Sequence, residues 1–213
     1  MDFSRDFIAL ACRKGVLRFG AFVTKAGRNS PYFFNAGLFD DGASFRELCG
    51  YYARTIRAAG IACDMLFGPA YKGIPLVTTT AVALAEHHHR SVPYAFNRKE
   101  AKDHGEGGNI VGTKLAGRVV IVDDVITAGT AIRESVELIR RAGATPVAVA
   151  LALDRQERGQ GTHSAVQEVE TEFGLRCISI LDLAGLIRSL EAHGGARPEE
   201  LAGLRAYRAR YGT

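Results

Sequence analysis

The feature that most constrains the fold of this chain is a regular alternation of short apolar runs with longer stretches of helical periodicity. The apolar runs, which we predict to be strands, cover residues 65–67, 92–96, 118–122, 146–153 and 177–181. The stretches with apolar residues at helical spacing include residues 73–87 and 130–142. Near-continuous apolar strands that alternate with helices are typical of a mostly parallel sheet with helices on both faces. The sequence therefore predicts an α/β fold with ligands bound beyond the carboxyl ends of its strands.

The remaining segments add helices and a small hairpin to this pattern. An opening helix that ends at Gly15 is predicted by the spacing of Phe3, Phe7, Ile8 and Ala11. Two apolar stretches predict a hairpin-like hood, formed mainly by residues 1–40, with strands near 17–23 and 31–35. Capping boxes predict two more helices, one at Ser44 with Glu47 and one at Ser164 with Gln167. Asp182 is predicted to cap a helix that ends near Glu191, and a peripheral, arginine-rich helix is predicted from Pro198. Without repeats or a linker, residues 1–213 are expected to form one domain.

Composition argues against several classes of protein. With 27 Lys plus Arg against 23 Asp plus Glu, the net charge of +4 is mild and spread along the chain, without the dense basic stripe of a nucleic-acid binder. The four cysteines are far apart and form no Cys-x-x-Cys pair, which favours buried reduced thiols over a zinc ribbon or redox motif. A charged start and a longest apolar run, residues 74–85, that is too short to span a bilayer predict a cytoplasmic protein.

Three successive histidines at 87–89 suggest a metal site that helical geometry opposes. Side chains of successive helical residues diverge by roughly 100 degrees. We therefore expect these histidines in the last turn of a helix, where partial positive charge is favourable.

The strongest signal for function follows the predicted strand at 118–122. Asp123 and Asp124 stand at its carboxyl end, where two carboxylates suit ribose hydroxyls or a hydrated magnesium ion. Residues 127–131, Thr-Ala-Gly-Thr-Ala, lead into a helix, and their small side chains let backbone N–H groups approach an anion at its N-terminus. No lysine follows, so this is not a Walker A loop. Taken separately, the acidic pair could be a helix cap, and the turn could be tight packing.

Joined on one strand, loop and helix, these residues resemble the phosphoribosyl diphosphate motif of the type I phosphoribosyltransferases. Four further segments narrow the resemblance to the bacterial orotate phosphoribosyltransferases, namely residues 30–35, 68–75, 96–109 and 153–158. The similarity runs from the first helix to about Leu190, without a departure at the motif positions. It implies the type I phosphoribosyltransferase fold, a central mostly parallel sheet flanked by helices with a small N-terminal hood.

The resemblance also implies a reaction. The 5-phosphoribosyl group of 5-phospho-α-D-ribose 1-diphosphate (PRPP) would be transferred to orotate, with orotidine 5'-monophosphate and diphosphate as products. This is a step of pyrimidine (UMP) biosynthesis, and its cofactor would be Mg²⁺. The family further implies a homodimer with shared active sites, and no nucleic acid or membrane as partner.

Roles for individual residues follow from the same resemblance. The catalytic residues would be Lys102, His104 and Asp124. PRPP would contact Lys25, Tyr71, Lys72, Arg98, Lys99, Lys102, His104, Asp123, Asp124, Val125, Ile126, Thr127, Ala128, Gly129, Thr130 and Ala131. Orotate would contact Phe33, Phe34, Thr127 and Arg155, with its carboxylate bound by Arg155. The magnesium ion would be held mainly by the diphosphate and ribose of the substrate, with Asp123 and Asp124 nearby.

Simpler interpretations stay open for the same residues. Loop 97–109 is predicted to be mobile and to close over the neighbouring subunit's site, but it could be a solvated charged surface. Lys72 could be an ordinary surface lysine, and Arg155 could be part of a charged run. Adjacent aromatic residues of a strand point to opposite faces, so one of Phe33 and Phe34 is expected in the core.

Two other functions compete with this hypothesis. One is a phosphoribosyltransferase for another base, such as uracil or a purine, and Arg155 would discriminate it because only orotate carries the carboxylate. The other is a non-catalytic nucleotide-sensing regulator. The basic loop argues against a sensor, which needs no cations to expel diphosphate.

Overall fold

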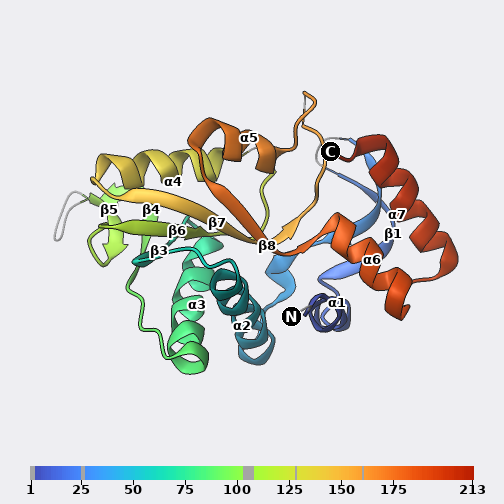
Figure 1. Cartoon of the computed structure of the whole chain (residues 1–213), viewed down its shortest axis with the longest axis horizontal. Coiled ribbons are helices and arrows are strands. Elements are labelled where there is room, and N and C mark those ends of the chain that lie inside the picture. Colours follow the sequence, from blue (N-terminus) through green and yellow to red (C-terminus); the bar gives the residue numbers. More distant parts are fainter. Residues whose placement is uncertain (1–2, 25–26, 103–107, 128, 160) are drawn as a thin grey trace.

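The architecture is a central sheet with helices on both faces and a small hairpin at one end (Figure 1). The computed structural model describes residues 3–24, 27–102, 108–127, 129–159 and 161–213, and for residues 100–102 and 108 the backbone alone. Within these ranges, the strand order of the six-stranded sheet is β5-β4-β3-β6-β7-β8. The strands are β3 (Met65–Gly68), β4 (Tyr94–Lys102), β5 (Gly108–Gly112), β6 (Arg118–Val122), β7 (Thr145–Asp154) and β8 (Arg176–Asp182).

Neighbouring strands of this sheet are parallel, except that β4 and β5 pair antiparallel at one edge. The predicted mostly parallel α/β fold is therefore confirmed. The order of the strands places β6 between β3 and β7. Residues that follow β6 consequently emerge at the centre of the carboxyl edge of the sheet, with the ends of two other strands beside them.

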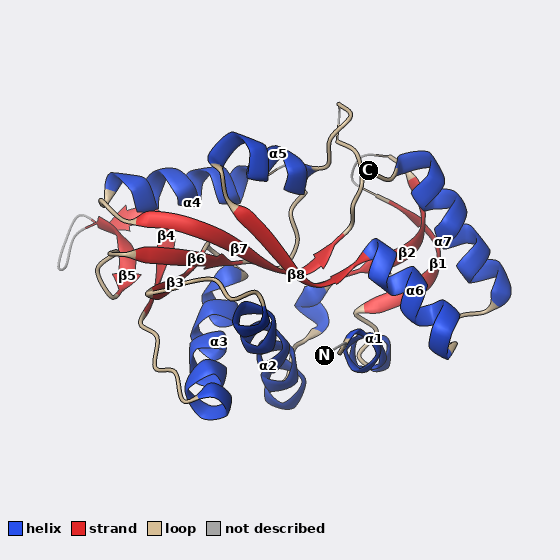
Figure 2. Cartoon of the chain, in the orientation of Figure 1, coloured by secondary structure: helices blue, strands red, loops and turns tan. Residues whose placement is uncertain are grey.

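Both faces at the centre of the sheet are buried, because β3, β6 and β7 are apolar at nearly every position. Val120 and Val122 of β6 pack in one core, whereas Val119 and Ile121 pack in the other. Figure 2 shows the helices that cover the two faces: α2 (Gly42–Ala58) and α3 (Gly73–His88) on one, α4 (Thr130–Arg141) and α5 (Ala165–Phe173) on the other. The alternation of side chains along a strand thus supplies each core with every second residue.

The hood is the antiparallel pair β1 (Leu17–Val23) and β2 (Asn29–Phe34), which confirms the predicted hairpin. Around it lie α1 (Ser4–Arg13), α6 (Leu183–His193) and α7 (Pro198–Tyr211), at the opposite end of the molecule from β5 (Figure 1). As predicted, α7 is peripheral: it lies at the end of the molecule and packs against it mainly through Leu204 and Tyr207. Gly203 of α7 faces Pro31 of β2, and this close approach lets the helix pack on the hood.

The predicted helix starts are confirmed in part. At α5, the hydroxyl of Ser164 accepts the N–H of Gln167, and the two form the predicted capping box. At α2, the prediction of a capping box at Ser44 is wrong, because Asp41 caps the helix and accepts the N–H groups of Ala43 and Ser44 at 2.9 Å. The carboxylate of Asp41 outcompetes the hydroxyl because a charged acceptor makes a stronger hydrogen bond to backbone N–H groups. His87 and His88 lie in the last turn of α3, as predicted, and His89 is its C-cap.

The edge hairpin corrects the prediction of a loop over residues 97–109. β4 extends to Lys102, and β5 begins at Gly108, with Lys102 and Gly108 as partners in the ladder. Cross-strand pairing at a sheet edge does not require apolar residues, so this polar sequence forms strands without apolar periodicity. The tip of the predicted loop, residues 103–107, lies outside the described residues.

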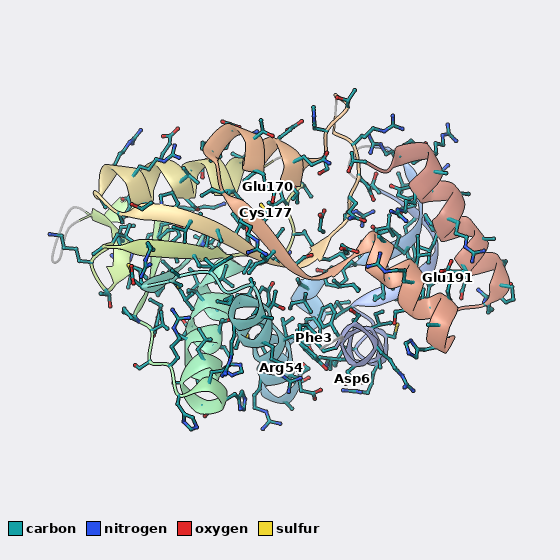
Figure 3. All side chains as sticks on the ribbon, viewed as in Figure 1. Phe3, Asp6, Arg54, Glu170, Cys177 and Glu191 are labelled. Atoms are coloured by element: carbon teal, nitrogen blue, oxygen red, sulfur yellow. The ribbon has the colours of Figure 1, made fainter. Side chains whose placement is uncertain are left out.

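The cysteines are free thiols in different environments. Cys49 and Cys63 are buried, as predicted, whereas Cys12 is exposed, contrary to the prediction. Glu170 and Cys177 lie together between α5 and β8 (Figure 3), where the carboxylate accepts the backbone N–H of Cys177 at 2.9 Å. Burial, reinforced by the charge of Glu170, raises the pKa of the Cys177 thiol to about 12 and keeps it protonated.

Among the residues that the structure describes, no helix combines the length and the apolar character needed to cross a bilayer. The cytoplasmic location stays a prediction.

Candidate active site

The acidic pair lies directly beyond β6, where the chain leaves the buried sheet. Asp124 is only 7% exposed, and its Oδ1 accepts the N–H of Val125 at 2.9 Å. The carboxylate of Asp123 accepts the N–H of Asp124, also at 2.9 Å. From α2, the hydroxyl of Tyr52 donates to the carbonyl oxygen of Asp123 at 2.8 Å. These contacts hold the backbone and both carboxylates in one defined arrangement.

The environment of the pair shifts the protonation of one of its members. Burial, with the adjacent charge of Asp124 as a second cause, raises the pKa of Asp123 to about 7. Two carboxylates this close cannot both ionise easily away from water. A cation or a set of hydroxyl donors placed against them would relieve this conflict, so the pair is suited to bind such groups.

The loop after β3 brings a lysine to the acidic pair. In this loop, Gly68 and Gly73 lie so close together that a Cβ on Gly68 would overlap the backbone of Gly73. The tight turn places Lys72 at the start of α3, with its Nζ 2.6 Å from Oδ2 of Asp124. A lysine at a helix N-terminus is unfavourable to the helix dipole. Asp124 supplies the compensating charge, and an anionic ligand could take over the same role.

The turn before α4 exposes the N-terminus of that helix. Gly129 adopts φ +73, a conformation that favours glycine, and a Cβ there would lie 2.8 Å from Nη1 of Arg133. Thr127 and Thr130 are exposed beside it, and α4 has no side-chain cap and no acidic residue in its first turn. Unpaired N–H groups at a helix N-terminus, without a competing carboxylate, suit a phosphate group.

Two other predicted members of this segment have side chains that pack against the cores. Val125 packs against the core that contains α2 and α3, and Ile126 packs against the core that contains α4 and α5. Ala128 lies outside the described residues. A contact of Val125 or Ile126 with PRPP would therefore depend mainly on backbone groups, as would that of half-buried Ala131.

The basic residues of β4 lie partly within the described chain. Nζ of Lys99 lies 4.9 Å from the ring centroid of Tyr71, an aromatic side chain that is 65% exposed. Asn97 anchors this loop, because its Oδ1 accepts the N–H of Ala70 at 2.8 Å. Arg98 is half-buried on the same strand. Outside the described residues lie the predicted Lys25 and His104 and the side chain of Lys102.

Three of the predicted base-binding residues, Phe33, Phe34 and Arg155, lie on the hood and directly after β7. Phe34 points toward the core, with its ring 6.5 Å from that of Phe7, whereas Phe33 stacks on Phe22 at 5.4 Å. Arg155, directly after β7, lies beneath the hood, and its Cζ is 4.4 Å from the ring centroid of Tyr32. One of the two adjacent phenylalanines thus packs in the core, as predicted, and it is Phe34.

Oxygen ligands at the acidic pair are compatible with magnesium. Hard cations prefer carboxylate oxygens, and Mg²⁺ commonly keeps several waters and substrate oxygens. Within the described part of the chain, no group of three or more His, Cys, Asp and Glu side chains could hold a metal by itself. Asp123 and Asp124 therefore fit an ion that a phosphorylated substrate largely coordinates, and do not form a complete metal site on their own.

Some supporting residues cannot be found by reading motifs. Tyr52, Asn97 and Glu157 hold the acidic pair, the loop before Lys72 and the guanidinium of Arg155, respectively. Tyr52 looks like one apolar position of an amphipathic helix. Asn97 and Glu157 stand within segments 96–109 and 153–158, but no local pattern marks their partners.

Comparison with known proteins assigns the family. Residues 37–172 match the model of the phosphoribosyl transferase domain, and the chain belongs to this family. The fold and site thus define a type I phosphoribosyltransferase. The chain is 61% identical to the orotate phosphoribosyltransferase of Thioalkalivibrio sulfidiphilus over 211 residues, or 99% of each chain. It is 60% identical to that of Edwardsiella ictaluri, again over 99% of each chain. The resemblance predicted from the sequence is therefore confirmed.

A solved structure supports the same relationship. The crystal structure of the orotate phosphoribosyltransferase of Francisella tularensis is 37% identical and matches with a TM-score of 0.89. The match covers 98% of this chain and 100% of the other. Hood and sheet are therefore shared along the full length.

Proposed function

We propose that this chain transfers the 5-phosphoribosyl group of PRPP to orotate and forms orotidine 5'-monophosphate and diphosphate. The reaction is that of a pentosyltransferase in pyrimidine biosynthesis. The structural observation that carries the proposal is the meeting of Lys72, Asp124 and the open N-terminus of α4 at one sheet edge. Full-length identity of about 60% to orotate phosphoribosyltransferases favours orotate as the base.

The sugar phosphate binds beyond β6. Asp123 and Asp124 accept hydrogen bonds from the ribose hydroxyls, and the turn 127–131 holds the 5'-phosphate with its backbone N–H groups. The shape of the turn supports this role, since Gly129 lets the backbone enter α4 without a side chain in the way. Fixing the ribose in this manner orients its anomeric carbon toward the base.

Cationic groups stabilise the departing diphosphate. As the bond from the anomeric carbon to oxygen breaks, the ribose gains oxocarbenium character and the diphosphate gains negative charge, so donors aimed at it lower the barrier. Lys72 moves from Asp124 to the diphosphate, joined by backbone N–H groups near Tyr71. The basic side chains of the hairpin complete the set, namely Arg98, Lys99, Lys102 and His104. Lys25 of the hood contributes near the diphosphate or base.

Magnesium is the proposed cofactor. When bound, it neutralises part of the diphosphate charge. Asp123 and Asp124 would lie near the ion and would orient the ribose hydroxyls beside it. The protein's own residues supply positioning and charge stabilisation, because the ring nitrogen of orotate is acidic enough to attack as an anion without a general base.

The base binds between the hood and the end of β7. Phe33 and Phe34 border the pyrimidine ring, with Thr127 on the ribose side, and Arg155 binds the carboxylate. A guanidinium suits a planar carboxylate because its donors form a fixed fork. The burial of Arg155 supports this role, since a ligand carboxylate would meet it with little competition from water.

A homodimer with shared sites completes the proposal. The residues around 97–109 reach the neighbouring subunit's site and exclude water that would otherwise hydrolyse the activated ribose. Two exposed apolar side chains, Tyr71 in the loop before α3 and Val82 of α3, are available for contact with a second subunit. Hybrid dimers of two inactive variants would test whether the sites are shared.

One assay separates the candidate functions. Orotate absorbance is followed with PRPP and Mg²⁺ present, and uracil and hypoxanthine are added as competing substrates. We expect orotate consumption that an excess of either competitor does not slow. Preferred consumption of another base would indicate a different transferase, and binding of PRPP without consumption of any base would indicate a sensor.

A further inference from the structure

A group of charged and aromatic side chains surrounds Arg155, and most of it has no part in the roles assigned above. Glu157 lies two residues beyond Arg155, Arg28 and Tyr32 come from the hood, and Tyr207 comes from α7. The side chains of Arg155 and Glu157 are only 18% and 14% exposed. The group lies where the hood, the end of β7 and α7 meet, so no single segment determines its geometry.

Glu157 binds one edge of the Arg155 guanidinium. Its Oε1 accepts Nε at 2.8 Å and Nη2 at 2.6 Å. The same Nη2 lies 3.4 Å from Oγ of Ser30, and the ring of Tyr32 covers one face. Because the guanidinium is planar and its donors are fixed, contacts on one edge and one face determine where the remaining donors point. Glu157 thus sets the direction in which Arg155 meets a ligand.

The charges of the group also depend on Glu157. Its Oε2 lies 3.9 Å from Nη1 of Arg28. The same Nη1 donates to the carbonyl oxygen of Arg158 at 2.7 Å, and Nη2 of Arg28 donates to that of Gly159 at 3.2 Å. Two guanidinium groups and one carboxylate leave one positive charge, which matches one ligand carboxylate. Without the Glu157 charge, Arg28 and Arg155 would repel each other in a poorly solvated corner.

The segment at the end of α7 holds the backbone that carries Glu157. The N–H of Arg158 donates to the carbonyl of Tyr211 at 2.9 Å, and Glu157 and Gly212 form an antiparallel bridge. The ring of Tyr211 also lies 4.9 Å from Cζ of Arg28. Glu157 is therefore fixed to α7 by its backbone and to the two arginines by its side chain.

We infer that Glu157 is a positioning residue for base recognition: it orients Arg155 toward the ligand carboxylate, and the segment after α7 holds Glu157 in place. The inference rests on the proposed function, because it takes Arg155 as the group that binds orotate. Glu157 itself makes no contact with substrate. Its loss should therefore change the KM for orotate and spare the KM for PRPP.

The test compares steady-state kinetics of four forms: the unaltered chain, Glu157→Gln, Arg155→Ala and the double variant. Glu157→Gln keeps size and an acceptor oxygen but removes the charge, so we expect the KM for orotate to rise about 10-fold. In the Arg155→Ala background, the same substitution should add little, because the side chain that it positions is absent. Glu137→Gln is the matched control, since Glu137 is exposed and pairs with exposed Arg141 of the same helix.

A second variant approaches the group from α7 without changing a charge. A Cβ on Gly212 would overlap the carbonyl oxygen of Arg208, so Gly212→Ala should displace the bridge to Glu157. We expect the KM for orotate to rise by less than in Glu157→Gln, again without a change in the KM for PRPP. Thermal unfolding of each variant shows whether the fold is retained.

The outcomes separate the inference from the function that it rests on. An unchanged KM for orotate in Glu157→Gln and Gly212→Ala, with Arg155→Ala impaired, would overturn the inference and leave the proposed function intact. A lowered KM would also overturn it, because Glu157 would then be a competitor of the ligand carboxylate. Equal rises in both KM values with a lower melting temperature would reduce Glu157 to a structural role. An unaltered chain that consumes no orotate would overturn both.

Discussion

The two halves of the candidate active site are built in different ways. The half assigned to the ribose phosphate is contiguous, because strand, acidic pair, turn and helix follow one another within residues 119–131. The half assigned to the base draws on three distant segments, at residues 28–34, 155–159 and 207–213. Local sequence therefore determines the first half, whereas the second depends on how the hood and α7 pack.

This difference separates two kinds of molecular specificity. A contiguous motif can keep its geometry in any protein with the same strand and helix, so it can anchor a sugar common to many reactions. A corner assembled from distant segments can change with each of them, and it can therefore select one base. Substitutions in the first half should abolish turnover, while those in the second should change substrate preference.

The largest effect is expected at the acidic pair. Asp124→Asn removes the charge that faces Lys72 and that, in the proposed function, faces the ribose hydroxyls, so turnover should fall by roughly 100-fold or more. Steady-state kinetics with orotate and PRPP measure this loss. Asp40→Asn, at an exposed carboxylate of the α1 side, is the control. Turnover close to that of the control would remove Asp124 from the mechanism.

Lys102→Ala should come next. A contact formed mainly in the transition state predicts a turnover about 100-fold lower, with a much smaller change in the KM for PRPP. Unaltered turnover would exclude Lys102 from catalysis.

The same variant tests the shared sites. In a hybrid of Lys102→Ala with Asp124→Asn, one site would combine the two intact residues, so activity should reappear. Mixed subunits with distinguishable tags, purified as hybrids, provide the measurement. Verified hybrids without activity would favour self-contained subunits.

Arg155→Ala tests the other half of the comparison. Loss of a charge-assisted hydrogen bond to the orotate carboxylate should raise the KM for orotate by roughly 10- to 100-fold and spare the KM for PRPP. A loss of orotate affinity below about 1 kcal/mol would be too small for such a contact. The comparison of the two KM values in one variant shows whether the two halves are separable.

Asn97→Ala should have a smaller effect on the sugar side. It removes the acceptor for the N–H of Ala70 and loosens the loop that carries Lys72, so the KM for PRPP should rise about fivefold. Thr113→Ala, at an exposed polar residue just beyond β5, is the control. Equal KM values in the two variants would show that the loop keeps its shape without Asn97.

The smallest effect concerns stability and pH. Because the pKa of Asp123 is raised to about 7 by burial and by Asp124, the folded chain binds a proton that the unfolded chain loses near pH 4. The stabilisation from this bound proton is complete below about pH 4 and is lost as the pH rises toward 7. The free energy of unfolding should therefore fall across that pH range. Asp123→Asn, which cannot ionise, should melt higher than the unaltered chain at pH 8 by more than it does at pH 5. Calorimetry in the absence of ligands measures the difference, and parallel curves would contradict the pKa shift.

Sequence patterns predict the elements whose residues carry their own signal. Strand β6 is predicted without error because all of its buried positions are apolar, and Ser164 caps α5 through a contact only three residues long. The contiguous half of the site shares this property. The apolar pattern predicts the start of β4 but misses its extension from Asn97 to Lys102 and its partner β5, which form by backbone pairing.

Contacts between distant residues explain what the sequence does not reveal. The acidic pair is evident from the sequence, but its support by Tyr52, 71 residues earlier, is not. Arg155 is a candidate from the resemblance, yet its link through Glu157 to Arg28 depends on packing of the hood. Position along the chain carries little information about such partners. The corner around Arg155 is built from contacts of this kind.

The tight turn between Gly68 and Gly73 has a consequence for protein engineering. The two backbones touch, so the turn has no room for a side chain at either glycine. Any added methyl group would push Lys72 away from the acidic pair. A transplant of this loop into another parallel sheet would therefore need both glycines and an equally close helix start. Grafting the lysine alone would move the charge without the geometry that aims it.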